Sequence, residues 1–298
     1  MIEELKTFMA VVEYESFTKA AEAINLSQPS VSLHIKYLEQ YFETNLIQRS
    51  VKQKQIHITD SGYFLYKRAK QILNLLEETK ESLLDYQHIT KGKLRIGSSF
   101  TIGEYFLPEF LGEFSSKYPM LELEVIIENT HDICEKMKHF QVDIALVEGN
   151  VFSSNLLVTP FYHDTMVLAV PHNHSLCSTP FSFSNLDNQT WISRESGSGT
   201  REYLDYFLSS NHIQPKNIMV FGSNYAIKEA VKNRLGITII SSLVTKSSIQ
   251  AKELSILDTH TTYHRNFSYV LQQGVIPSKN ISLFVDMLKK YAHTLDSK

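Results

Sequence analysis

Residues 16–39 read SFTKAAEAINLSQPSVSLHIKYLE, and this pattern predicts two short helices joined by a tight turn. The first helix is expected to begin at Thr18, whose hydroxyl can cap free backbone N–H groups, and its alanines allow a second helix to cross closely. Ser27 is expected to cap the second helix. Pro29 fits the first turn of that helix, because no intrahelical hydrogen bond is lost there.

The second helix is expected to bury one face and to expose a polar one. Val31, Ile35 and Leu38 recur at helical spacing, which is typical of a stripe packed against a core. The opposite face then presents hydrogen-bonding groups suited to base edges and phosphates. An ordinary pair of solvated helices is the alternative from spacing alone. On the first interpretation, a helix-turn-helix, DNA contacts are predicted for Gln28, Pro29, Ser30, Ser32, His34 and Lys36.

Basic residues follow the helix pair. Residues 46–59 end in alternating apolar and polar residues, which predicts a short hairpin, and Arg49, Lys52 and Lys54 on it are expected to contact phosphates. A solvated basic loop is the alternative. Between residues 27 and 70, seven Lys or Arg stand against three Asp or Glu, although the whole chain has a net charge of −3. A basic patch in an acidic chain is typical of a regulator with a separate sensing domain.

These motifs together resemble the N-terminal winged helix-turn-helix of the LysR-type transcriptional regulators, over about the first quarter of the chain. One departure is Glu43, where the family usually has Gly, and another is Leu46-Ile47, where Leu-Phe is common. The resemblance implies a DNA-binding domain at residues 1–62 that binds double-stranded promoter DNA. It rests on Ser16-Phe17-Thr18, Ala20-Ala21, Ser27-Gln28-Pro29-Ser30-Val31-Ser32 and Leu38-Glu39.

A long amphipathic helix is predicted from Asp60 to about His88, with a length of about 40 Å. In LysR-type regulators this linker helix pairs with its copy in a second subunit. The resemblance therefore implies a linker at residues 63–90 and a homodimer or homotetramer. Such an assembly holds two DNA-binding domains over a two-fold-related site. Packing against its own chain is the alternative. The apolar stripe consists of Leu65, Ala69, Ile72, Leu73, Leu76 and Leu83.

Short apolar runs alternate with helical segments over residues 91–298, which predicts a parallel-rich sheet with helices on both faces. This portion resembles the periplasmic-binding-protein-like effector domain of the same family. The resemblance implies lobe I at about 91–161 and 268–298, and lobe II at about 162–267. The expected fold class is α/β, with an N-terminal winged helix-turn-helix, a long linker helix and a C-terminal two-lobed effector domain.

Two stretches rich in hydroxyls and glycine, residues 98–103 and 194–201, predict a cleft. Hydroxyls and free N–H groups at a strand-to-helix turn can hold an anion without a cationic side chain. Taken singly, each Ser or Thr is more often a helix cap. Matching stretches imply effector contacts by Ser98, Ser99, Thr101, Asn129, Thr130, Glu148, Ser196, Ser198, Thr200, Arg201, Ser223 and Asn224.

The cleft motifs look most like those of the family members that control sulfur assimilation and cysteine biosynthesis, with carbon-fixation regulators next. That likeness implies an activator that works with RNA polymerase and responds to a small anionic or zwitterionic effector, such as sulfate, a reduced sulfur species or an acetylated serine. The alternatives are a regulator of carbon or aromatic metabolism, and a cytoplasmic small-anion binding protein without a transcriptional role.

Enzyme, metal and cofactor chemistry have little support in the sequence. Ser198 lacks the Gly-x-Ser-x-Gly spacing, and no phosphate-loop or Rossmann glycine series is present. His172 and His174 have no carboxylate or thiol nearby, and Cys134 and Cys177 are expected to be buried, reduced thiols. The N-terminus does not read as a signal peptide, and no apolar run approaches the roughly 18 residues of a membrane span. A cytoplasmic protein without membrane contact is therefore expected.

Overall fold

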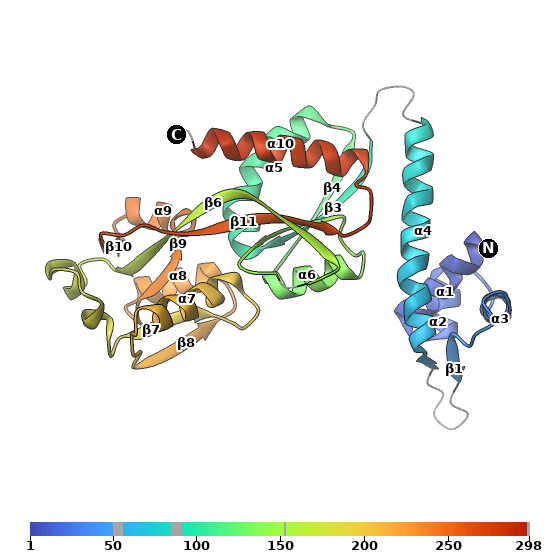
Figure 1. The fold of residues 1–298 in the computed structure, drawn as a ribbon, viewed down its shortest axis with the longest axis horizontal. Coiled ribbons are helices and arrows are strands. Elements are labelled where there is room, and N and C mark those ends of the chain that lie inside the picture. Colours follow the sequence, from blue (N-terminus) through green and yellow to red (C-terminus); the bar gives the residue numbers. More distant parts are fainter. Residues whose placement is uncertain (50–55, 85–90, 152, 297–298) are drawn as a thin grey trace. The chain divides into compact units, whose positions relative to one another are not determined.

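The computed structural model describes residues 1–49, 56–84, 91–151 and 153–296 (Figure 1). The chain divides into two compact units, Met1–His88 and Ile89–Lys298. Within the described ranges, the structure contains no helix that is both long and apolar enough to cross a bilayer.

The first unit consists of three helices, a hairpin and a long helix. We call the three helices and the hairpin the head. Ser16 caps its second helix by accepting a hydrogen bond from the backbone N–H of Lys19 at 3.3 Å, so this helix begins at Phe17 and the predicted cap at Thr18 is wrong. Ser27 caps the third helix as predicted, accepting from the Ser30 N–H at 3.2 Å. The elements are α1 (Ile2–Tyr14), α2 (Phe17–Ala23), α3 (Gln28–Tyr41), β1 (Ile47–Arg49), β2 (Ile56–Ile58) and α4 (Asp60–Leu84).

The long helix α4 has two different halves. Leu65 and Ala69 are buried in the core of the head, together with Phe8, Val11 and Leu38. Farther along, the apolar side chains at positions 72, 75 and 76 are exposed in the described chain. The helix is described as far as residue 84, whereas the prediction extended it to about residue 88; residues 85–90 lie outside the described chain.

The second unit is built on a seven-stranded sheet in the order β10-β6-β11-β5-β3-β4, with β9 also paired to β6. Parallel pairing was expected and is found for β3 with β4 and with β5. The prediction is wrong for β6 and β11, which pair antiparallel along their whole common length. The strands are β3 (Gly92–Ser99), β4 (Leu121–Glu128), β5 (Ile144–Glu148), β6 (Leu156–Pro171), β9 (Thr238–Ser241), β10 (Leu254–Ile256) and β11 (Tyr263–Gln272).

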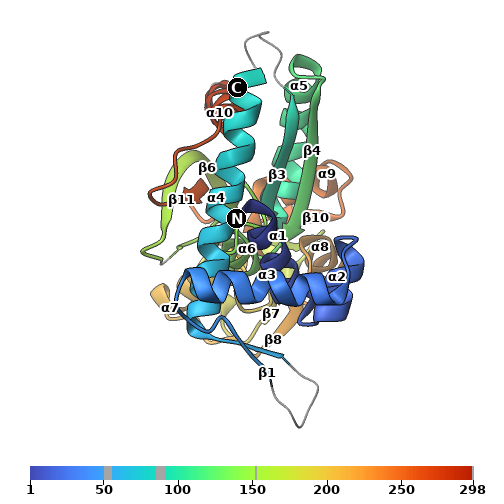
Figure 2. The same cartoon turned by 90° about the vertical axis from the view of Figure 1, so that its right-hand side faces the viewer.

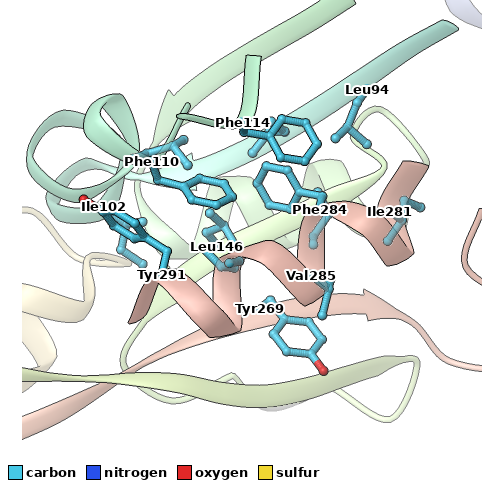
Figure 3. Packing of buried hydrophobic residues seen from close by; sticks show 14 of the residues in the cluster. Leu94, Ile102, Phe110, Phe114, Leu146, Tyr269, Ile281, Phe284, Val285 and Tyr291 are labelled. Atoms are coloured by element: carbon cyan, nitrogen blue, oxygen red, sulfur yellow. The ribbon is translucent and has the colours of Figure 1, made fainter. Parts of the chain in front are cut away.

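Helices cover both faces of the first part of this sheet. We call this part lobe I and take it as residues 91–165 and 264–296, which moves the predicted boundary with lobe II by four residues along β6 and along β11. The helices η2 (Ile102–Phe106), α5 (Leu107–Lys117) and α10 (Lys279–Asp296) pack on one face, and α6 (Thr130–Lys138) packs on the other. Figure 3 shows the aromatic core under α10, where the rings of Phe110 and Phe284 meet edge to face with centroids 5.1 Å apart.

Residues 166–263, which we call lobe II, have their own core around the buried Trp191. A second, parallel pair of strands, β7 (Thr190–Arg194) and β8 (Asn217–Phe221), lies beside β9. The strands β7 and β10 were not predicted. The helices of lobe II are η3 (Ser175–Ser178), η4 (Phe183–Leu186), α7 (Gly199–Ser210), α8 (Asn224–Lys232) and α9 (Ser242–Gln250).

Candidate DNA-reading helix and effector cleft

The helix α3 presents most of the predicted DNA contacts on the face opposite its buried stripe. Gln28, Pro29 and Lys36 are exposed, and Ser30 and Ser32 are half-buried beside them. The Gln28 side-chain amide donates to the Ser32 hydroxyl at 3.2 Å, which orients it at the N-terminal end of the helix. Figure 2 shows α3 in side view within the first unit, running across the direction of α4.

His34 departs from the predicted outward orientation. Its ring is half-buried, and its Nδ1 lies 2.8 Å from the hydroxyl of Thr7 on α1. The Thr7 hydroxyl donates its proton to the Glu3 carbonyl at 2.8 Å, so it can only accept from His34. The proton of a neutral His34 is therefore on Nδ1, and its Nε2 is an acceptor.

Leu33 and Tyr37 are exposed on the same side of α3 and were not predicted as contacts. Their apolar and aromatic side chains lack the hydrogen-bonding pattern on which the predicted contacts rest. Of the three cations predicted to contact phosphates from the hairpin, Arg49 ends β1, while Lys52 and Lys54 lie outside the described residues.

In the effector domain, the structure brings several predicted cleft residues together around one buried carboxylate. Glu148 ends β5 and is 1% exposed. Its carboxylate accepts from the hydroxyls of Ser99 and of Thr101, the latter at 3.1 Å, and its backbone carbonyl accepts from the Thr130 hydroxyl at 2.9 Å. The predicted cradle therefore holds an oxyanion that belongs to the protein itself.

Arg265 on β11 is the cation of this cluster, and the sequence analysis missed it. It donates from Nε to Asp164 on β6 at 2.8 Å, and its Nη1 lies 3.9 Å from a Glu148 oxygen. Its two terminal nitrogens also donate to Thr101 in lobe I at 3.1 Å and to Thr200 in lobe II at 3.0 Å. One guanidinium thus joins both lobes to both buried carboxylates. A single arginine shortly before the apolar end of β11 was the signal that could have found it.

A second contact between the lobes runs through Asn224 at the start of α8. Its amide donates to the Thr101 hydroxyl at 3.0 Å and accepts from the Arg194 guanidinium at 3.2 Å. Arg194 is fully buried, stacks over the Phe100 ring at 4.3 Å, and pairs with Glu195. These contacts connect lobe II with residues 100 and 101 of lobe I.

Burial governs the ionisation of the two central carboxylates. Desolvation raises the pKa of Glu148 and of Asp164, and the charge of Arg265 opposes that rise at both. The Arg265 guanidinium is the largest influence that favours the ionised form of both carboxyl groups.

The backbones of the two lobes meet at two glycines. A Cβ on Gly199 would lie 2.2 Å from the Glu148 carbonyl oxygen, and one on Gly149 would lie 3.0 Å from the Gly199 Cα. Beside this contact, Glu202 accepts from the Asn150 backbone N–H at 3.0 Å. The close approach requires glycine, because any side chain would separate the lobes.

Two cavities flank this glycine contact. One, of about 440 Å³, lies between α6 and α7 and is lined by Thr130, Ser196, Ser198 and Arg201, among others. The other, of about 550 Å³, lies between α7 and the strands β6 and β11 and reaches Arg265. Four of the twelve predicted effector residues thus line open space.

Several of the predicted effector residues have structural partners, including two of the four that line the cavity. Asn129, Ser198 and Ser223 each cap a helix, α6, α7 and α8 respectively. Ser98 donates to the Ser99 carbonyl at 3.2 Å. Arg201 pairs with Asp205 in the same helix and does not reach Glu148 in the described contacts.

The histidines and cysteines considered in the sequence analysis form no metal or disulfide site among the described residues. His174 caps η3, and no group of three or more His, Cys, Asp or Glu in the described part of the chain is placed to hold a metal. Cys134 is buried as expected, and burial raises its pKa to about 11. Cys177 is exposed, so the prediction that it is buried is wrong.

A winged helix-turn-helix joined to a two-lobed α/β domain defines a ligand-responsive transcriptional regulator. Residues 2–63 match the model of the bacterial regulatory helix-turn-helix proteins of the lysR family, and residues 88–292 match the LysR substrate binding domain. The chain belongs to the LysR family of transcriptional regulators, which confirms the family prediction made from its motifs.

Individual relatives agree with this assignment. The chain is 44% identical to the HTH-type transcriptional regulator CysL of Bacillus subtilis (strain 168), over 96% of this chain and 95% of CysL. It is 31% identical to the probable RuBisCO transcriptional regulator of Phaeodactylum tricornutum, over 99% and 98% of the two chains. The Synechocystis PCC6803 CcmR regulatory domain in complex with 2-PG is similar in fold, with a TM-score of 0.63 and 28% identity over 68% of this chain and 98% of that one.

Proposed function

We propose that this LysR-type regulator activates genes of sulfur assimilation and cysteine biosynthesis when a small anionic or zwitterionic effector binds between lobes I and II. The motifs of the cleft resemble those of sulfur regulators, and the identity to CysL supports this pathway. Promoter DNA and RNA polymerase are the proposed macromolecular partners, and the cytoplasm is the proposed location. The test is to sequence the genomic fragments that the purified protein retains; sulfur genes should lie downstream of the enriched sites.

One observation supports an anionic effector. The hydroxyls of Ser99 and Thr101 already hold a carboxylate, that of Glu148, next to the Arg265 guanidinium. An effector with a carboxylate or sulfur oxyanion can make the same hydrogen bonds, since these donors suit any oxyanion of similar size. It has to compete with Glu148 for them, so the buried side chain weakens anion binding while it is ionised.

Glu148→Gln is therefore expected to bind such an anion about tenfold more tightly than the wild type, because like-charge repulsion is removed. Calorimetric titration with sulfate, thiosulfate and O-acetylserine measures this. Since burial holds the pKa of Glu148 above its ordinary value, wild-type affinity should rise as the pH falls and Glu148 becomes protonated. The variant should lose that contribution to the pH dependence.

Glu135→Gln is the matched control. It removes the same charge from a half-exposed residue that lines the cavity between α6 and α7 but has no hydrogen bond to the buried cluster. Its affinity should stay close to that of the wild type. Equal affinities in all three proteins, or no binding of any of the three compounds, would contradict an anion site at Glu148.

A regulator of carbon metabolism is the second candidate. The relative named as a probable RuBisCO transcriptional regulator covers nearly the whole chain, and the similar CcmR domain holds 2-PG. Enrichment of carbon-fixation genes among the retained genomic fragments would favour this candidate.

The exposed part of α4 supports assembly into a homodimer or homotetramer. Its apolar side chains at positions 72, 75 and 76 are exposed beyond the head, and a stripe of this kind is stabilised by burial against a second helix. Two copies of α3 would then be held at a fixed separation over one DNA site.

Base reading by α3 is tested through Gln28. Gln28→Ala should cost about 1–3 kcal/mol of binding free energy on a selected DNA site and little on random DNA, because a glutamine amide contacts base edges. Gln40→Ala is the matched control: it removes the same exposed amide near the C-terminal end of the helix. Electrophoretic mobility shifts with both DNAs measure the effect. A loss of equal size in both variants would contradict the assignment of base reading to the N-terminal end of α3.

A further inference from the structure

The most exposed large apolar side chain of the first unit, among its described residues, is Leu33 on α3, with 65% of its surface exposed. The core of the head does not use it, since α3 buries Val31, Ile35 and Leu38 on its other side. A leucine in this position leaves apolar surface in water without stabilising the fold.

The neighbours of Leu33 indicate what covers it. Gln28, Pro29, Ser32 and Lys36 lie within one to five positions along the same helix, and they combine hydrogen-bonding groups with one cation. No Asp or Glu occurs in the sequence between residues 28 and 38. An apolar side chain set in an acid-free, partly basic face fits the major groove of DNA better than it fits a protein surface.

The major groove offers one apolar group for such a side chain. Thymine carries a C5 methyl there, whereas the other base edges present hydrogen-bond donors and acceptors. We propose that Leu33 packs against a thymine methyl in the major groove and so favours thymine at the base pair that it contacts. This proposal rests on the assignment of α3 as the DNA-reading helix, and it adds a specificity-determining residue to it.

The test replaces each thymine of a selected site by uracil, which removes only the methyl group. The site is first selected from random duplexes with the full-length wild-type protein. Replacement of the one contacted thymine in a half-site by uracil should weaken wild-type binding about fourfold, which is the effect of one buried methyl-sized group. Fluorescence anisotropy at fixed salt measures the affinities.

Leu33→Ala should bind the thymine and uracil duplexes equally, and Leu33→Met, which retains an apolar side chain of similar volume, should restore the preference. Both variants should fold, because Leu33 is exposed. If no thymine shows a difference between wild type and Leu33→Ala, the proposal is overturned, and a change in oligomeric state in that variant would assign Leu33 to a protein contact instead. Wild-type protein that selects no sequence would overturn the reading-helix assignment as well.

Discussion

Replacing Arg265 with methionine is expected to lower the free energy of unfolding of the effector domain by about 3–5 kcal/mol, because it leaves Glu148 and Asp164 buried without their cation. The guanidinium is nearly inaccessible and donates to Asp164, Thr101 and Thr200. Calorimetry of the full-length protein should show a lower transition temperature for this domain, with the transition of the DNA-binding unit unchanged.

The same variant should recover stability as the pH falls. Without Arg265, the pKa of each buried carboxyl rises further above its unfolded value, so the folded state binds protons that the unfolded state releases. The stability contributed by these two carboxyls is therefore greatest at low pH and is lost as the pH rises through their folded-state pKa. Arg201→Met is the control, since its pair with Asp205 is partly exposed and within one helix, and it should cost about 0.5 kcal/mol or less. Equal losses in the two variants would contradict the central role of Arg265.

Gly199→Ala is expected to destabilise the closed arrangement of the two lobes by about 3 kcal/mol, at the upper end of the usual cost of overpacking. The added Cβ would lie 2.2 Å from the carbonyl oxygen of Glu148. Because that oxygen belongs to the backbone of β5, no change of side-chain rotamer can relieve the clash. Urea denaturation of the full-length protein measures the loss.

Gly112→Ala is the matched control, because it makes the same substitution within α5, where no atom lies within 4 Å of the new Cβ. It should be neutral or stabilise by up to about 1 kcal/mol, since alanine favours a helix. If Gly199→Ala were as stable as this control, the close contact between lobes would be of no consequence for folding.

The DNA-binding head was predictable from sequence because its signals are local. Ser27, Pro29 and the spacing of Val31, Ile35 and Leu38 define the start and the buried side of α3 within a few residues. His34 was assigned to the wrong side because the Thr7 hydroxyl that holds it comes from α1, which is distant in the sequence.

The cleft was only partly predictable, because some of its residues come together from distant parts of the chain. Ser99 and Thr101 were singled out from one local stretch and Glu148 from the family resemblance, and the structure places them in contact. Arg265 and Asp164 join them through the antiparallel register of β6 and β11, in which these two residues are direct partners. No local pattern specifies that register, so the charge that completes the site was missed.

The pairing of β6 with β11 also defines how the effector domain is put together. Met166 lies opposite Tyr263 in this ladder, so the chain leaves for lobe II and returns from it at adjacent points. Lobe II is therefore an insertion between the two strands of a hairpin, β6 and β11, whose paired parts belong to lobe I. A shorter turn between the same two strands would retain the aromatic core beneath α10 (Figure 3). Exchange of the whole insert between relatives would change one wall of the ligand site in a single genetic event while leaving the other wall in place.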